Sequence, residues 1–186
     1  QKDTSQTTIE SVTDKRSFSP EIEHILTERI VTLEQVTTHP DIVSAVIASN
    51  VEHSTMTDVD IVNMDTELQA ASPDDAVLKE LFEGSAATHL RVFQNNHPEF
   101  PEIFITDRFG INVAQTNVTS DYYQADEDWW RETYNAGVGK THFGEIEYDA
   151  SAEADSIPLY VPIYQEGQLV GVLKAILSVS FVQSAL

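Results

Sequence analysis

The spacing of apolar residues in this chain changes from a helical period to a strand period at about residue 100. Between residues 20 and 36 apolar side chains recur at every third or fourth position: Ile22, Ile25, Leu26, Ile30, Leu33 and Val36. Ser19, Pro20 and Glu21 precede this run, and a serine cap, a first-turn proline and a first-turn acid are typical of a helix start. The pattern therefore predicts a long N-terminal helix from about residue 20.

Two further helices are expected before residue 96. His39-Pro40 ends the first run, and a shorter apolar helix is predicted over residues 42–48. A polar stretch with Asp58, Asp60 and Asp65 follows, which we interpret as a solvated acidic surface because a calcium loop needs a mid-loop glycine and a terminal glutamate. Ser72-Pro73-Asp74-Asp75 then repeats the start signal, and the apolar positions in 77–93 predict a second long helix.

The second half has the pattern of an antiparallel sheet. The predicted strands are residues 103–106, 111–114, 143–148, 157–164 and 169–179. Asp107-Arg108-Phe109-Gly110, a turn with glycine at its end, separates the first two. One short helix, residues 127–134 with Asp126 as its cap, interrupts the strands. Pro158 and Pro162 have no N–H to donate, so their strand is expected to be bulged or at an edge locally.

The order of these elements predicts the fold class. Helices come first and a small antiparallel sheet follows, which defines an α+β protein. We divide the chain into an N-terminal helical region, residues 1–95, and a sheet core, residues 96–186.

Composition excludes several functional classes. The 186 residues include 31 Asp and Glu but only 10 Lys and Arg, for a formal net charge of −21. Nucleic-acid binding and polybasic membrane binding both need clustered basic residues, so neither is expected. The hydrophobic content of 41% is that of a folded domain. The acidity indicates either a salt-adapted surface or an attraction for cations.

The chain shows no pattern typical of a catalytic or metal site. Cysteine is absent and the six histidines lack metal-ligand spacing, so no metal or other cofactor is expected. Residues 137–141 match only the tail of a P-loop, and no Gly-x-Ser-x-Gly elbow occurs. Glu145, Glu147 and Asp149 alternate along a predicted strand, which is more typical of the wet side of a sheet than of a hydrolase. We therefore expect a protein that is not an enzyme.

One segment is unusually dense in functional side chains. Residues 121–131 hold four aromatic and five charged residues. Such rings suit a cage for a small molecule, above all a cation, but they could equally cover the sheet as core. Lys174 shares its predicted strand face with Val170, Val172 and Ile176. It either reaches water at the sheet edge or enters a pocket and binds an anion.

The order of motifs in the second half resembles Cache domains, the extracytoplasmic PAS-like sensor modules of histidine kinases, chemoreceptors and diguanylate cyclases. The segments that carry the resemblance are residues 103–110, Asp121-Tyr122-Tyr123, Asp128-Trp129-Trp130, Tyr160-Val161-Pro162-Ile163-Tyr164 and Gly171-Val172-Leu173. The resemblance covers about residues 90–180. It implies a central antiparallel PAS-like sheet with the long helix against one face and, against the other, a ligand pocket roofed by the Tyr-Tyr to Trp-Trp segment.

The resemblance also implies which residues bind the ligand. Counted from Tyr122, Trp129 and Trp130 match the aromatic positions of amino-acid-binding members, whereas the position of their carboxylate-clamping arginine holds Glu127. Arg131 or Lys140 could replace that arginine. Asp149 and Asp155 are the two candidates for the family aspartate that holds a ligand amine. The full set of candidates is Tyr122, Tyr123, Asp126, Glu127, Trp129, Trp130, Arg131, Tyr148, Asp149 and Asp155.

From this resemblance we expect the periplasmic or extracellular sensor domain of a transmembrane receptor. The parent protein would enter the membrane before Gln1 and again after Leu186. The partners would be a small amine or amino-acid-like ligand and a second copy of the chain, paired through the N-terminal helix. The alternative is a divalent-cation-responsive or structural acidic domain without an organic ligand.

Overall fold

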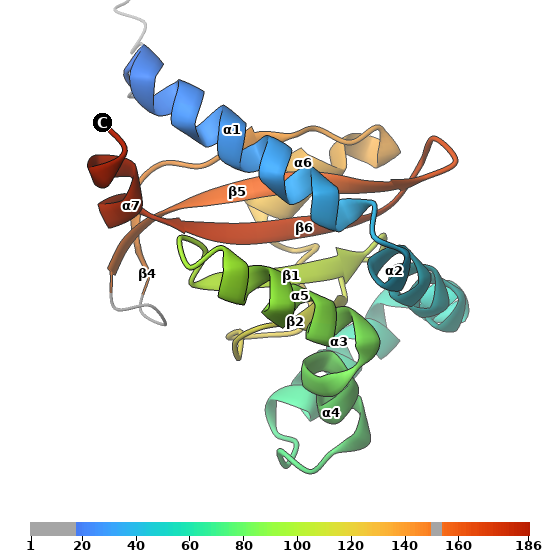
Figure 1. The fold of residues 1–186 in the computed structure, drawn as a ribbon. Coiled ribbons are helices and arrows are strands. Elements are labelled where there is room, and N and C mark those ends of the chain that lie inside the picture. Colours follow the sequence, from blue (N-terminus) through green and yellow to red (C-terminus); the bar gives the residue numbers. More distant parts are fainter. Residues whose placement is uncertain (1–17, 150–153) are drawn as a thin grey trace, which may run out of the picture.

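The computed structural model describes residues 18–149 and 154–186, and it has the expected α+β architecture (Figure 1). The helices are α1 (Pro20–Thr37), α2 (Pro40–Glu52), η1 (His53–Thr55), α3 (Asp58–Gln69), α4 (Ala76–Glu83), α5 (Ser85–Asn96), α6 (Asp128–Tyr134), η2 (Asn135–Gly137) and α7 (Val179–Ser184). The strands are β1 (Glu102–Asp107), β2 (Asn112–Gln115), β3 (His142–Phe143), β4 (Glu147–Asp149), β5 (Ala154–Gln165) and β6 (Gln168–Ser178). The boundary at residue 95 falls where helices give way to strands; as a division into domains it stays a prediction.

The strands form one antiparallel sheet in the order β2-β1-β6-β5-β3, with β4 also paired to β5. The predicted turn after β5 connects it to β6 in a long hairpin, and β6 lies between β5 and β1. The last strand is therefore the central strand of the sheet. Side chains on the two faces of β6 are therefore covered only by the helices and loops that pack on the sheet.

The two faces of the sheet are covered by different helices. Helices α1, α2 and α5 cross one face, and α6 lies behind the other in Figure 1. The first face holds the main hydrophobic core, a cluster that includes Leu26 and Leu33 of α1 and Ile103, Leu173 and Leu177 of the sheet. These five side chains are fully buried, and each contributes about 1.5–3 kcal/mol of hydrophobic free energy. The long helix therefore lies against one face, as expected.

Three helical predictions need correction. The polar stretch after α2 is helix α3, because Thr57 and Asp60 form a capping box at its start and Ile61 and Leu68 are buried along it. The second long helix is two helices, α4 and α5, which meet at Gly84. Helix α6 starts after Glu127 and has no side-chain cap, so Asp126 does not cap it.

The prolines of β5 lie as predicted. The Pro158 carbonyl accepts a hydrogen bond from the Gly144 N–H, on the side of β5 that faces away from β6. Strand β3 pairs only with Leu159 and Tyr160, and the register of β5 against β6 shifts after Ile163. Within the described residues, the outer edge of β5 therefore has no strand partner at Pro162, where an N–H is missing anyway.

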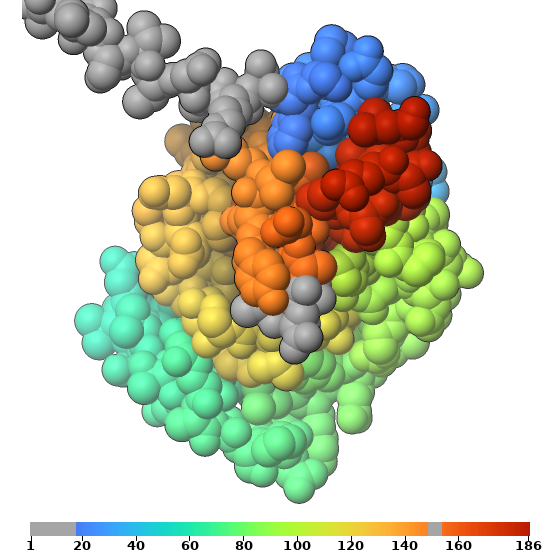
Figure 2. Space-filling view, turned by 90° about the vertical axis from the view of Figure 1, so that its left-hand side faces the viewer, coloured from blue at the N-terminus to red at the C-terminus, as the bar shows by residue number. Residues whose placement is uncertain are grey.

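The beginning of α1 and the short helix α7 lie at the same end of the molecule (Figures 1 and 2). The guanidinium of Arg29 in α1 lies 5.6 Å from the centre of the Phe181 ring in α7, and it also pairs with Glu99. Among the described residues, no helix has both the length and the apolar character that crossing a bilayer requires.

Candidate ligand-binding site

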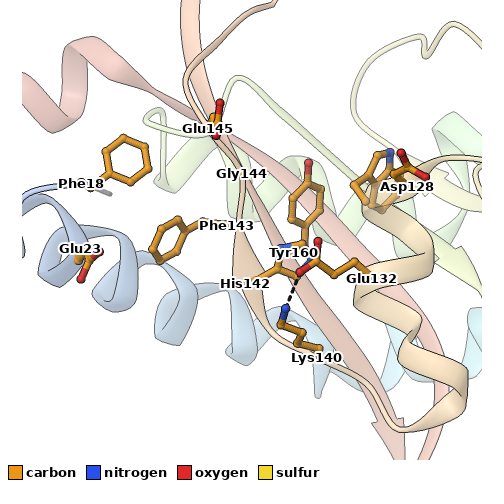
Figure 3. Close-up of a pocket in the computed structure, with 11 residues that line it drawn as sticks. Phe18, Glu23, Asp128, Glu132, Lys140, His142, Phe143, Gly144, Glu145 and Tyr160 are labelled. Carbon is orange, nitrogen blue, oxygen red and sulfur yellow. Dashed lines mark hydrogen bonds and ion pairs between the residues drawn. The ribbon is translucent and has the colours of Figure 1, made fainter. Parts of the chain in front are cut away.

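A cleft of about 530 Å³ lies between α6, strand β3 and the beginning of α1 (Figure 3). It lies at the β3 edge of the sheet. The residues that line it are Phe18, Glu23, Asp128, Trp129, Glu132, Lys140, His142, Phe143, Gly144, Glu145 and Tyr160. Its volume is in the range of small-molecule sites.

The floor beside this cleft is a row of side chains on the sheet face that α6 covers. Phe104, Lys174, Tyr160 and His142 are direct register partners across β1, β6, β5 and β3, so they share one face. Trp129 stacks on Tyr160 at 5.1 Å between ring centres and 11° between planes, and it meets Phe104 edge-on at 6.0 Å. The Trp129 indole therefore lies between these two rings, above the middle of the row.

The neighbouring tryptophan attaches α6 to the sheet. The Trp130 Nε1–H donates to Thr106 Oγ1 at 2.9 Å, and both side chains are buried. The Trp130 ring also stacks on Tyr134 with centres 4.7 Å apart. Adjacent residues on one helical turn thus have different roles, since Trp130 is an anchor and Trp129 contacts the cleft.

The segment from α6 to β3 forms one wall of the cleft. Lys140 forms an ion pair with Glu132 across this wall. Thr133 Oγ1 donates to the Trp129 carbonyl at 2.6 Å and lies 3.0 Å from His142 Nε2, so the side chain ties α6 to β3. The helix ends because Asn135 takes a left-handed conformation.

The charge of the cleft is negative. Four carboxylates line it, those of Glu23, Asp128, Glu132 and Glu145, against the single ammonium of Lys140. Burial of the Tyr160 phenol raises its pKa, and nearby carboxylates, first that of Glu147, raise it further. Tyr160 is therefore a neutral hydrogen-bonding group at physiological pH. Such a cleft attracts a cationic group electrostatically.

The Tyr-Tyr part of the predicted roof lies against α3. Tyr122 is buried in a second apolar cluster with Leu68, Leu78 and Leu81. The backbone N–H groups of Tyr122 and Tyr123 donate to Asp65 Oδ1 at 2.7 and 3.1 Å. Burial raises the pKa of both phenols. Neither tyrosine is among the residues that line the cleft.

The charged candidates in this segment lie at the start of α6. Asp126 and Glu127 are exposed. The Arg131 guanidinium donates to the carbonyls of Ala125 and Asp126 and pairs with Asp128 at 2.6 Å, so it holds its own turn together.

The remaining candidates lie in the β4–β5 hairpin. Tyr148 and Asp155 are register partners there, and both are exposed. Asp149 pairs with Ala154 at the end of β4. Of the candidates whose side chains the structure describes, Trp129 lines the cleft, and ligand binding by the others stays a prediction.

Sequence reasoning missed most of the cleft. Tyr160 and His142 become neighbours only through the register between β5 and β3, and Phe18 and Glu23 approach from α1. Strand alternation could have placed Tyr160 on one face of β5, but it could not have shown which helix covers that face. Among the described residues, no group of three or more His, Asp or Glu side chains could hold a metal ion.

The fold is that of PAS-like Cache sensor domains, which confirms the fold implied by the sequence resemblance. No protein-family profile and no curated protein matches the sequence. The structure is similar to the Escherichia coli DcuS sensor domain, with a TM-score of 0.51 and 11% identity over 90% of this chain and 98% of that one. It is also similar to the ligand-binding domain of the Pseudomonas fluorescens chemoreceptor CtaA in complex with L-valine, with a TM-score of 0.52 and 16% identity.

The second match covers 89% of this chain but only 58% of the CtaA domain, so this chain spans a little over half of that structure. At these identities the likeness establishes the fold. One of these structures is a sensor domain and the other is a chemoreceptor ligand-binding domain.

Proposed function

We propose that this chain is the extracytoplasmic sensor domain of a membrane receptor and binds a small amine or amino-acid-like molecule in the cleft beside α6. The observation that carries the proposal is Trp129, which lines an acidic cleft of about 530 Å³ in a sensor-type fold. Aromatic faces and surplus carboxylates together favour a ligand that carries an ammonium group.

A signal would follow from movement of α6. Trp130 attaches this helix to β1, and Trp129 contacts β5 and β1, so a ligand that changes the position of Trp129 changes how α6 packs on the sheet. Ligand affinity must differ between two arrangements for such a change to transmit a signal. The output domain would be that of a histidine kinase, a chemoreceptor or a diguanylate cyclase.

The positions of α1 and α7 fit a receptor that enters the membrane on both sides of this domain. The beginning of α1 and the short α7 lie at one end of the molecule, so segments that continue from them could reach the same bilayer (Figure 2). Pairing of two copies along α1 belongs to the same proposal. Its outward face carries the exposed Val31 among polar residues, whereas its inward face is taken up by the sheet.

Calorimetric titration with a panel of amines, carboxylates and amino acids tests this function. We expect at least one ammonium-bearing compound to bind, and Tyr160→Ala, which removes a ring that lines the cleft, to weaken it at least tenfold. Phe109→Ala, which removes a partly exposed ring in the β1–β2 turn, is the matched control and should leave the affinity unchanged. Binding of carboxylates alone would argue against an amine ligand. Stabilisation by Mg²⁺ or Ca²⁺ alone would favour the cation-responsive alternative.

A further inference from the structure

Lys174 is an inward-facing cation on the central strand of the sheet. Its ammonium lies 5.0 Å from the centre of the Trp129 ring and 5.8 Å from that of Phe104, and its side chain is partly buried. None of the ion pairs formed among the described residues includes it. In a chain with three times as many acids as bases, a partly buried basic residue that lies against two aromatic rings is a candidate for a specific role.

A second unsatisfied donor lies on the same face. Gln115 is the register partner of Phe104 on β2, just as Lys174 is on β6. The Gln115 side chain is fully buried, its Oε1 accepts from Asn112 Nδ2 at 3.0 Å, and its Nε2 has no hydrogen-bond partner among the described residues. Phe104 lies between Gln115 and Lys174 in the register, so the two donors flank this ring on one face of the sheet. Buried polar groups are normally paired, so the unpaired Gln115 amide favours an acceptor supplied from outside.

The space above Lys174 is filled by a side chain that is not anchored there. The Trp129 indole lies between Phe104 and Tyr160 through ring contacts, and it makes no hydrogen bond with the described residues. Trp130 next to it is buried and bonded to Thr106, so α6 can stay attached while the Trp129 ring rotates away. Rotation of this ring would expose the ammonium to the cleft that Trp129 lines.

We propose that Lys174 binds the carboxylate of the ligand and that the ligand takes the place of the Trp129 indole between Phe104 and Tyr160. This inference rests on the proposed function and specifies the ligand as a zwitterion. Its carboxylate pairs with Lys174 in the sheet, while its ammonium faces the carboxylates of the cleft.

An alternative role for Lys174 is to balance the charge of Glu102. Glu102 is a buried acid on the same face, but its register partner on β6 is Ile176, two residues beyond Lys174. In that case Lys174 would be a counterion that balances Glu102 and would have no effect on ligand affinity. Binding of a ligand carboxylate and charge balance with Glu102 predict different effects of a substitution at Lys174.

The test is calorimetric titration of the whole chain with amino acids, each accompanied by the amine left after decarboxylation and the acid left after deamination. We expect at least one amino acid to bind, and its decarboxylated amine to bind at least tenfold more weakly. Lys174→Met, which keeps the apolar stem, should weaken the amino acid roughly 10- to 100-fold, the range for loss of a hydrogen bond to a charged group. Lys79→Met, which removes an exposed lysine on α4, is the control and should have no effect.

A fluorescence measurement reports the displacement of the indole. Trp129 and Trp130 are the two tryptophans of the chain, so an emission change that the wild type shows and Trp129→Phe lacks reports on Trp129, while Trp130 still anchors α6. Emission should shift to longer wavelength on addition of the bound amino acid, because the ring moves from the sheet toward water. No shift on addition of its decarboxylated amine is expected, since that compound cannot pair with Lys174.

Three results would overturn the inference. If decarboxylated amines bind as tightly as their amino acids and Lys174→Met changes neither affinity, the proposed function stands but Lys174 is not part of the site. If Lys174→Met lowers only the melting temperature, and Glu102→Gln restores it in the double variant, Lys174 is a counterion. If no compound of the panel binds the wild-type chain, the proposed function and this inference both fail.

Discussion

Removal of the Asp107 carboxylate should be among the most destabilising single substitutions in this protein. Asp107 ends β1 and is fully buried. Its Oδ1 accepts the backbone N–H groups of Phe109 and Ile111 at 2.9 and 3.0 Å. Its Oδ2 accepts from Ser49 Oγ at 2.9 Å and lies 2.7 Å from His53 Nδ1. One carboxylate thus joins the β1–β2 turn to the C-terminal part of α2.

The expected cost follows from these contacts. Asp107→Ala leaves two backbone donors, a hydroxyl and an imidazole without their acceptor, and the loss of such a buried hub costs about 3–5 kcal/mol. Asp107→Asn keeps an oxygen for the two turn N–H groups. Its amide N–H₂ faces Ser49, whose proton can turn away, and His53, whose Nδ1 accepts in the other tautomer. We expect this variant to cost only about 1–2 kcal/mol.

Urea unfolding followed by far-ultraviolet circular dichroism measures both costs. The control is Asp74→Ala, which removes an exposed carboxylate paired with Lys79 and should leave the midpoint unchanged. Natural domains have total stabilities of about 5–15 kcal/mol, so Asp107→Ala should unfold at much lower urea or not fold at all. A loss below about 1 kcal/mol for Asp107→Ala, or an equal loss for Asp107→Asn, would refute the reasoning.

Three further predictions concern pH and backbone conformation. Burial raises the pKa of Tyr160 above its ordinary 10.0, so the neutral phenol stabilises the folded chain below pH 10.0 and this stabilisation is lost as the pH rises above 10.0. Tyr160→Phe should therefore flatten the alkaline decline in the urea midpoint. Burial and the stacked His39 ring lower the pKa of His89 below 6.5, so His89 binds a proton more tightly in the unfolded chain than in the folded one. The free energy of unfolding therefore falls as the pH drops through 6.5. His89→Gln should show a smaller fall in urea midpoint between pH 7 and 5. Gly110→Ala should cost roughly 2–4 kcal/mol in the same urea assay, because φ there is +85° and the new Cβ would lie 2.5 Å from that of Ala125. A wild-type response in any of these variants would contradict its explanation.

The secondary structure followed local signals closely where those signals were complete. Ser19-Pro20 starts α1, and the turn at Asp107 and the hairpin between β5 and β6 lie where the sequence indicated. The errors have local causes. The polar pattern predicts a solvated surface at Asp60, whereas this residue caps α3 together with Thr57. Gly84 divides a helix that the apolar spacing alone predicts to be continuous.

The candidate site depended more on distant contacts. The sequence indicated the importance of residues 121–131, but the structure separates this segment into Tyr122 against α3 and α4, Trp130 against Thr106, and Trp129 beside the cleft. The residues that face Trp129 come from β1, β5 and β6. No local pattern in the sequence states these pairings, because strand register is set by which faces become buried.

By itself, the sequence determined the α+β class, the long first helix and the antiparallel strands, because these depend on apolar period and helix capping. Tertiary structure alone decided the position of Lys174. Its strand period showed which residues share its face, but only the sheet order places β6 at the centre and Trp129 above it. A central strand has no edge at which an ammonium can reach water directly. The sequence is compatible with either a solvent-exposed or an inward-facing Lys174. The structure places its ammonium against two aromatic rings, where the proposed ligand carboxylate would reach it.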